Sequence, residues 1–222
     1  VSTGWFKVVS AELLNEEKYN DDEDAWYYAD GSGHLYAGEF KTIKGKKYAF
    51  RNDGRMIDGL KFIKDEGTSL DVIADDDDTF NSGNDNLTVY ADDDSTYGFD
   101  NEDDFLDNAV DFYEPNGYKC YYFGGDDDGA MRTNKNTVEI DGDKYNFYFE
   151  KSGGNKGAGL TGEKDDKYYQ SGKLIKAGSD DKYQVVKVNT YAKNSDLDET
   201  LAEGTDITAY DKLDDVDAFL KD

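Results

Sequence analysis

The sequence contains few of the residues from which enzyme sites and disulfide frameworks are commonly built. Its 222 residues include one Cys, one His, one Pro and two Trp. The single Cys120 allows no intramolecular disulfide. A catalytic thiol needs a basic partner, and His34 directly follows a turn glycine, where we expect an exposed side chain without a role. Asp and Glu are so numerous that their proximity identifies no glycosidase-type carboxylate pair. The sequence therefore predicts that the protein is not an enzyme.

Basic residues and long apolar runs are also scarce. Lys and Arg number 25 against 51 Asp and Glu, so the formal net charge is −26. A chain of this charge repels phosphate backbones, which excludes nucleic acid as a partner. No run of about 18 apolar residues is present, so the sequence predicts no membrane span. The chain begins inside what resembles the end of a repeat and has no signal peptide. We therefore expect a fragment of a longer exported protein.

What the sequence does contain is a short repeat. Each copy has aromatic residues, a polar turn, a glycine and then Met or Leu, and the copies cover residues 26–35, 48–56, 121–131 and 168–174. The marker glycine moves from position 33 to 54, a step of 21 residues, and from 129 to 172, a step of 43. A looser copy at residues 145–153 lies in the longer interval. A period of about 20 residues indicates stacked small units rather than one globular core.

Each copy predicts a β-hairpin. The aromatic residues form a short strand, and an Asp/Asn-x-Gly or Ser-Gly element supplies the positive φ of a tight turn. On this interpretation the Lys-rich stretch 41–47 leads from one unit to the next. One hairpin cannot bury its apolar face alone, so neighbouring hairpins stack on one another. The predicted fold is mainly β, a β-hairpin repeat solenoid with repeats at residues 1–64 and 118–182.

An acidic insertion interrupts the repeats at residues 65–117. It contains 18 Asp or Glu residues and no Lys or Arg. Its first part has acidic runs at residues 75–78 and 92–94, which we expect to face solvent. Clustered Asp side chains at residues 75–78 of the insertion, and at residues 126–129 outside it, could offer oxygen ligands to calcium. Neither has the ligand spacing of a calcium loop, so we expect no metal site.

The second part of the insertion predicts a helix over residues 102–113. Asn101 can cap it, and three acidic residues follow at the positive end of the helix dipole. The apolar residues fall at helical spacing and need a surface to bury them, which we expect the flanking hairpins to supply. These residues are Phe105, Leu106, Ala109, Val110 and Tyr113.

The last segment, residues 183–222, changes character again. Tyr183, Val185, Val186 and Val188 alternate loosely, which predicts a terminal strand. Apolar residues at helical spacing within residues 211–222 predict a short terminal helix.

The stretch from Gly45 to Gly59, Gly-Lys-Lys-Tyr-Ala-Phe-Arg-Asn-Asp-Gly-Arg-Met-Ile-Asp-Gly, resembles the cell-wall-binding or choline-binding-type repeat of Gram-positive surface proteins. Glucan-binding repeats and the C-terminal repeats of clostridial toxins are similar. The resemblance covers roughly residues 1–60 and 118–178. It implies an exported protein at the cell surface that binds choline on teichoic acids, or glucans and other glycans.

The resemblance also implies where a ligand binds. The family's cage uses two Trp and a third aromatic residue from a neighbouring hairpin, and a cation or a sugar face rests on the rings. The first of the two Trp positions is occupied by Trp26 in one copy, and by Lys47, Cys120, Lys144 or Lys167 in the others. At the second position, Trp5 is the only Trp among the copies. The resemblance therefore implies at most one ligand site. Its residues are Trp5, Trp26 and Tyr28, with help from Tyr48 or Phe50.

Three functions follow from these observations. The first is a non-catalytic surface module that binds a cell-wall polymer or a host glycan. The second is a structural spacer or adhesin whose acidic insertion contacts a protein partner, with or without calcium. The third is the binding region of a larger enzyme or toxin. Each aromatic ring has a simpler alternative role in hairpin packing, and Cys120 has one as a small buried apolar residue.

Overall fold

The computed structural model describes residues 3–16, 19, 24–73, 99, 101–125, 127–177, 185–191 and 207–213. The chain forms two compact units. Unit 1 comprises Val1–Thr96 and Tyr121–Arg132, and unit 2 comprises Tyr97–Cys120 and Thr133–Asp222. The division of the chain into four segments stays a prediction, and the acidic runs at 75–78 and 92–94 lie outside the described residues.

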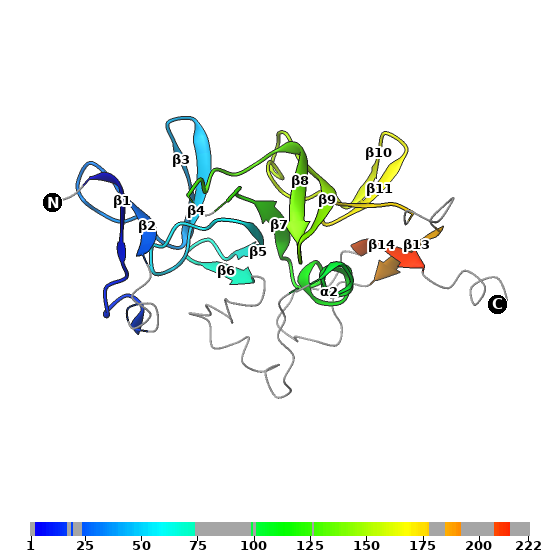
Figure 1. Ribbon diagram of the computed structural model, residues 1–222, viewed down its shortest axis with the longest axis horizontal. Helices are drawn as coiled ribbons and strands as arrows, with labels where there is room; N and C mark the ends of the chain where they lie inside the picture. The colour runs from blue at the N-terminus through cyan, green and yellow to red at the C-terminus, as the bar shows by residue number, and fades with distance from the viewer. Residues whose placement is uncertain are drawn as a thin grey trace. The chain divides into compact units, whose positions relative to one another are not determined.

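Unit 1 consists of antiparallel strand pairs, as the repeats predict (Figure 1). The pairs are β1 (Gly4–Val9) with β2 (Asp24–Ala29), β3 (Glu39–Ile43) with β4 (Lys46–Phe50), and β5 (Leu60–Asp65) with β6 (Leu70–Ile73). The mainly β fold with antiparallel hairpins is therefore confirmed.

The tight hairpin turn is not where the sequence placed it. β3 and β4 join at Lys44 and Gly45, which both have positive φ, at 49° and 83°. Two successive residues with φ > 0 give the turn whose twist matches that of paired strands. The Lys-rich stretch 41–47, predicted to link two units, is thus the hairpin itself. The Asn52-x-Gly54 element closes a smaller loop, in which Phe50 and Met56 form an isolated bridge.

The acidic insertion lies within a hairpin rather than between two repeats. In the β3–β4 hairpin, the Gly38 N–H donates to the carbonyl of Arg51 at 3.0 Å. The Gly59 N–H donates to the carbonyl of Gly124 at 2.9 Å in the same way. β5, which follows Gly59, therefore pairs with β7 (Lys119–Tyr122), and the strand order is β6-β5-β7. The acidic insertion therefore lies, in the sequence, between the two paired strands β5 and β7.

Backbone hydrogen bonds join each hairpin to the next one. In each case, a residue beyond the turn of one copy donates its N–H to the carbonyl of the residue at the Trp26-equivalent position of a preceding copy. Two of the donors, Met56 and Met131, lie two positions after the marker glycine, whereas Gly159 lies six positions after Gly153 of the looser copy. The bonds are Met56 to Trp26 at 2.7 Å, Met131 to Lys47 at 2.8 Å and Gly159 to Cys120 at 2.8 Å. These bonds satisfy backbone groups that an isolated hairpin would leave unpaired, so they are the direct sign of stacking that the repeat period predicted.

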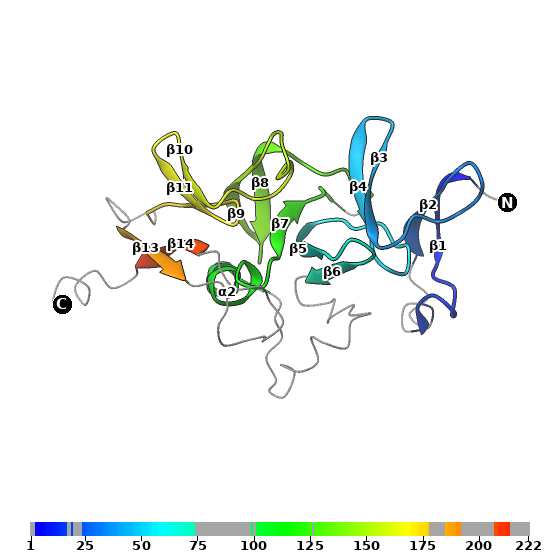
Figure 2. The ribbon, with the colours of Figure 1, turned by 180° about the vertical axis from the view of Figure 1, so that it is seen from behind.

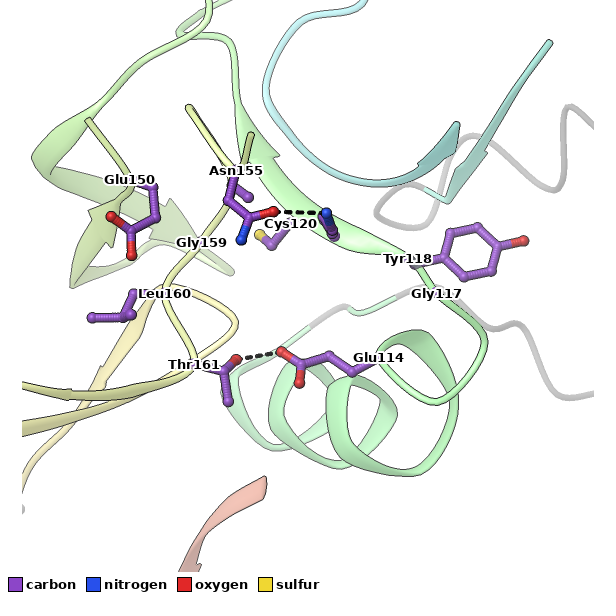
Figure 3. A pocket seen from close by; sticks show the side chains of 11 residues that line it. Glu114, Gly117, Tyr118, Cys120, Glu150, Asn155, Gly159, Leu160 and Thr161 are labelled. Atoms are coloured by element: carbon purple, nitrogen blue, oxygen red, sulfur yellow. Dashed lines mark hydrogen bonds between the residues drawn. The ribbon is translucent and has the colours of Figure 1, made fainter. Parts of the chain in front are cut away.

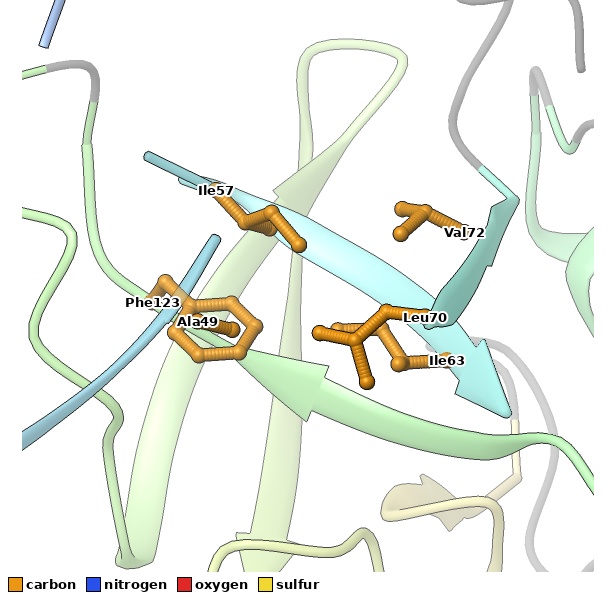
Figure 4. Close-up of a cluster of buried hydrophobic side chains, with 6 residues drawn as sticks. All are labelled: Ala49, Ile57, Ile63, Leu70, Val72 and Phe123. Atoms are coloured by element: carbon orange, nitrogen blue, oxygen red, sulfur yellow. The ribbon is translucent and has the colours of Figure 1, made fainter. Parts of the chain in front are cut away.

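The side chains of unit 1 that meet between hairpins form an apolar core (Figure 4). β4, β5, β6 and the residue after β7 all contribute to it. The cluster consists of Ala49, Ile57, Ile63, Leu70, Val72 and Phe123. Because these residues come from strands that cannot bury their faces alone, the core requires at least two stacked hairpins.

In unit 2 the predicted helix is present. α2 (Glu102–Asn108) begins at Asn101, whose side chain accepts a hydrogen bond from the Asp104 N–H at 2.9 Å. It continues into a π-helical segment, η2 (Ala109–Tyr113), in which the Glu114 N–H donates to the carbonyl of Ala109. Phe105 is fully buried and packs edge-to-face on Phe147 of a hairpin strand at 5.5 Å. The packing of this helix on a hairpin is confirmed.

Unit 2 also contains a five-stranded antiparallel sheet in the order β10-β11-β12-β9-β8. Figure 2 labels four of its strands, β8 to β11. Its strands are β8 (Asn134–Ile140), β9 (Asp143–Phe149), β10 (Gly162–Lys164), β11 (Lys167–Gln170) and β12 (Lys173–Ile175). Three of its turns, at residues 141–142, 165–166 and 171–172, again have two successive positive φ angles. No helix in the described part of the chain has the length and apolarity that a membrane crossing requires.

The predicted terminal helix over residues 211–222 is wrong at its start. β13 (Val185–Tyr191), the predicted terminal strand, pairs along its whole length with β14 (Ile207–Leu213). β14 is rich in β-branched and aromatic residues, and seven backbone pairs with β13 outweigh the weak helical spacing of its last three residues. Residues 214–222 lie outside the described part of the chain.

Candidate functional site

The five residues predicted to bind a ligand come from three strands of unit 1. Trp5 lies on β1, Trp26 and Tyr28 on β2, and Tyr48 and Phe50 on β4. Side chains two residues apart on a strand share a face, which places Trp26 beside Tyr28 and Tyr48 beside Phe50. Trp5 is directly opposite Tyr28 in the β1–β2 register. Strand alternation therefore directs all five side chains toward one place.

Trp5 is the centre of this group. The distances from its ring centroid are 6.4 Å to Trp26, 5.1 Å to Tyr28, 4.8 Å to Tyr48 and 5.9 Å to Phe50. The first three pairs are edge-to-face and the fourth is stacked. All five predicted residues are thus brought together around one ring, although whether they bind a ligand stays a prediction.

The group has a floor and a surface. Tyr48 and Phe50 are 8% and 0% exposed and pack with Ile43, Met56 and Ala130. Trp5, Trp26 and Tyr28 are half-buried and lie against that floor. Because the rings of the group touch one another, a ligand would rest on the outer faces of the half-buried rings, and the two floor residues would support them.

A sixth ring, Tyr36, belongs to the same group and was not predicted. It stacks on Tyr28 with centroids 5.2 Å apart and an interplanar angle of 14°. Its N–H donates to the carbonyl of Tyr28 at 3.0 Å, which fixes this position. An aromatic residue two positions before the closing Gly38 was the signal in the sequence. We refer to Trp5, Trp26, Tyr28, Tyr36, Tyr48 and Phe50 as the aromatic cluster.

A carboxylate lies at the edge of the aromatic cluster. Asp127 accepts hydrogen bonds from Nε1 of Trp26 at 2.8 Å and from Nζ of Lys7 at 3.1 Å. These two bonds lower the pKa of Asp127, so the group is an anion at neutral pH. Its side chain is 72% exposed, and it can therefore attract a cation from solvent.

The Asp-rich stretch 126–129 is accounted for in part by these contacts. Asp127 holds Trp26 and Lys7, and Asp128 forms an ion pair with Arg132. Among the described residues, no three His, Cys, Asp or Glu side chains are grouped so that they could hold a metal ion. Residue 126 and the run at 75–78 lie outside that part of the chain.

No protein-family model and no curated protein matches this sequence. Solved structures that are similar to it include choline binding protein F from Streptococcus pneumoniae, with 17% identity and a TM-score of 0.41 over 83% of this chain. CbpJ from Streptococcus pneumoniae is 18% identical over 78% of this chain with a TM-score of 0.20. The modular autolysin LytC from Streptococcus pneumoniae is 16% identical over 76% with a TM-score of 0.20.

These neighbours are choline-binding proteins and an autolysin, as the resemblance of the repeat predicted. At such TM-scores, the likeness itself carries no argument about the ligand. The chain spans 39%, 48% and 30% of the length of the three proteins. The account of the site below therefore rests on the hairpins and rings described above.

Proposed function

We propose that the chain is a non-catalytic module of an exported surface protein, and that it attaches to a cell-wall polymer or glycan through the aromatic cluster. The ligand group is a quaternary ammonium, such as the choline of a teichoic acid, or the apolar face of a sugar. The half-buried faces of Trp5, Trp26, Tyr28 and Tyr36 over the floor of Tyr48 and Phe50 carry this proposal.

The physical argument concerns what a quaternary ammonium can bind. It has no N–H to donate, so its attraction is to the negative faces of aromatic rings, with about 0.5–1 kcal/mol for each exposed contact and more when water is excluded. Asp127 adds a charge of opposite sign at the edge of the cluster. Nζ of Lys7 lies 5.9 Å from the centroid of the Trp26 ring and is hydrogen-bonded to Asp127. It is therefore the positive group that a ligand cation would displace.

The module has one such site and not a row of them. In the other copies, the position of Trp26 is taken by Lys47, Cys120, Lys144 or Lys167. A cation is repelled by Lys at that position, and Cys offers no ring face. A single site of exposed contacts binds weakly on its own, so firm attachment requires several such modules on one polymer.

Retention on immobilised choline and on purified choline-bearing cell walls tests the proposal. Trp26→Ala should abolish retention while far-UV and near-UV spectra show an intact fold. Tyr168→Ala, which removes an exposed aromatic ring on β11 of unit 2, is the control and should change retention little. Equal loss in the two variants, or a parent chain that is not retained, would contradict a localised site.

A second function is favoured by one observation, the position of the acidic insertion between the two paired strands β5 and β7. The connection between two paired strands is a place from which a long segment can be displayed. In this alternative the repeats are a spacer or adhesin, and exposed carboxylates of the acidic insertion contact a protein partner, with or without calcium. A chain that is not retained on choline but captures a basic protein through residues 65–117 would support it. The module could also serve as the binding region of a larger enzyme or toxin.

A further inference from the structure

Unit 2 contains a pocket of about 490 Å³. It lies between the residue that follows η2, the start of β7 and the loop between β9 and β10. Polar side chains surround it, and Leu160 and Cys120 form apolar parts of its wall (Figure 3). The polar residues are Glu114, Lys119, Glu150, Asn155 and Thr161.

Two residues of the pocket lining, Cys120 and Gly159, hold positions that the repeat relates to unit 1. Cys120 and Gly159 are joined by the same backbone hydrogen bond that joins Trp26 and Met56 in unit 1. Two large side chains are thus replaced by a thiol and a hydrogen atom. A Cβ at Gly159 would lie 2.3 Å from the carbonyl oxygen of Ser171, so no larger residue can occupy that position.

Two carboxylates face the pocket. Glu114 accepts hydrogen bonds from the hydroxyls of Thr161 and Ser171, the latter at 2.6 Å. The side chain of Gln170 also hydrogen-bonds to Glu114, and a carboxylate with about four lone-pair sites can still accept a further hydrogen bond. Burial raises the pKa of Glu114 even though these hydroxyls lower it, which means that a positive charge nearby would favour its ionised form. Glu150 contributes the second carboxylate from the opposite side of the pocket (Figure 3).

Lys119, the one basic residue in the lining, is hydrogen-bonded to another residue of the lining. Lys119 donates from Nζ to Oδ1 of Asn155 at 2.9 Å. The lining has two acidic side chains, Glu114 and Glu150, and one basic side chain, Lys119, so its formal charge is negative and it disfavours anions. The described residues offer no set of three ligating side chains here for a metal ion. A ligand that matches this lining is cationic and organic.

We propose that this pocket binds a small ligand with a primary or secondary ammonium group. Such a group has N–H donors, which form charge-assisted hydrogen bonds with the carboxylates of Glu114 and Glu150. The remaining carbon atoms of the ligand would contact Leu160, Ala158 and Cys120. This site differs in chemistry from the aromatic cluster, because it would accept hydrogen bonds from the N–H groups of a ligand. The aromatic cluster would instead bind a quaternary ammonium, which has no N–H group. The two sites would let one module bind two kinds of amine.

Three small molecules that share a two-carbon chain with a hydroxyl group test the proposal on the full chain. Ethanolamine has a primary ammonium, choline replaces its three N–H groups with methyls, and ethylene glycol is uncharged. With ¹⁵N-labelled protein, ethanolamine should shift the amide signals of Gly159 and Thr161, with saturation at up to about 10 mM. Choline should leave those two amides unchanged and shift the indole signal of Trp26. Loss of one response without the other separates this proposal from the function of the aromatic cluster.

Variants make the test specific. Glu150→Gln removes one charge and keeps the shape, and it should weaken ethanolamine binding about tenfold. Glu163→Gln, at an exposed position on β10 outside the pocket, is the matched control and should leave binding unchanged. Equal weakening by both variants would show a general effect of the chain's negative charge and overturn the proposal. Shifts of the same two amides by ethylene glycol or choline, or none with ethanolamine, would overturn it as well.

Discussion

The indole N–H of Trp26 donates to the carboxylate of Asp127, which lies 101 residues later in the sequence, at 2.8 Å. The loop of one repeat copy thus fixes the orientation of an aromatic side chain in another copy. The same carboxylate binds Lys7. Stacking of hairpins consequently does more than bury apolar faces, because it places a negative charge beside rings that are expected to bind a cation.

This relationship predicts the effect of Asp127→Asn. The amide keeps a hydrogen-bond acceptor for Trp26 but removes the negative charge. Choline binding should weaken about threefold, with a reduced dependence on salt, because the lost interaction is exposed and screened. The thermal midpoint should stay within about a degree of the parent value. Titration at low and at high NaCl measures both effects, and an unchanged affinity at low salt would show that Asp127 contributes no attraction.

The floor and the surface of the aromatic cluster should differ in stability. Phe50→Ala removes a fully buried ring and should lower the free energy of unfolding by about 3–5 kcal/mol. Tyr36→Ala removes a half-buried ring and should cost clearly less, while it weakens ligand binding. Urea denaturation with a choline titration for each variant tests this division. Similar losses of stability in the two variants would contradict it.

The aromatic cluster was largely predictable from the sequence because strand alternation is a local property. Trp26 with Tyr28, and Tyr48 with Phe50, share a face in any strand. The helix at residues 102–113 was predictable for a similar reason, since its cap at Asn101 and its apolar stripe lie within one short segment.

Features that depend on distant partners were not predictable in the same way. Asp127 is linked to Trp26 only through the stacking of copies, and the pairing of Gly59 with Gly124 shows that the insertion lies inside a hairpin. The turn was misplaced because Asn52-x-Gly54 is a stronger turn signal than Lys44-Gly45. The terminal helix was wrong at its start because apolar spacing over a few residues cannot outweigh seven strand pairs.

Asp53 should make stability depend on pH in the acidic range. Burial alone would raise its pKa, but the hydrogen bond from Asn15 and the charge of Arg55 outweigh burial and lower it. A carboxyl group whose pKa is lower in the folded state binds more protons in the unfolded state. Its ionised form therefore stabilises the fold at pH values above the unfolded-state pKa. This contribution to stability is lost as the pH falls through the folded-state pKa. Urea midpoints of the parent and Asp53→Asn should converge below about pH 4. A constant difference between them down to about pH 2 would contradict this assignment.

Salt should stabilise the protein as a whole. The chain has a net charge of −26, and 18 of its carboxylates lie in residues 65–117 without Lys or Arg. Their repulsion is screened over about 8–10 Å at physiological ionic strength, so thermal midpoints should rise with NaCl. Calcium should give no larger rise at equal ionic strength. A larger, saturable rise with millimolar calcium would instead reveal a metal site, because binding to the folded state alone stabilises it.

The most direct test of the central claim is a measurement of which protons of the protein lie next to a bound quaternary ammonium. Intermolecular nuclear Overhauser effects from the methyl protons of choline should reach the rings of Trp5, Trp26 and Tyr28. The two Trp residues of the chain make the assignment straightforward. Effects on those rings, lost in Trp26→Ala, are the result that the account predicts. Effects only on rings of unit 2, such as Tyr145 or Tyr168, or none at saturating choline, would contradict it.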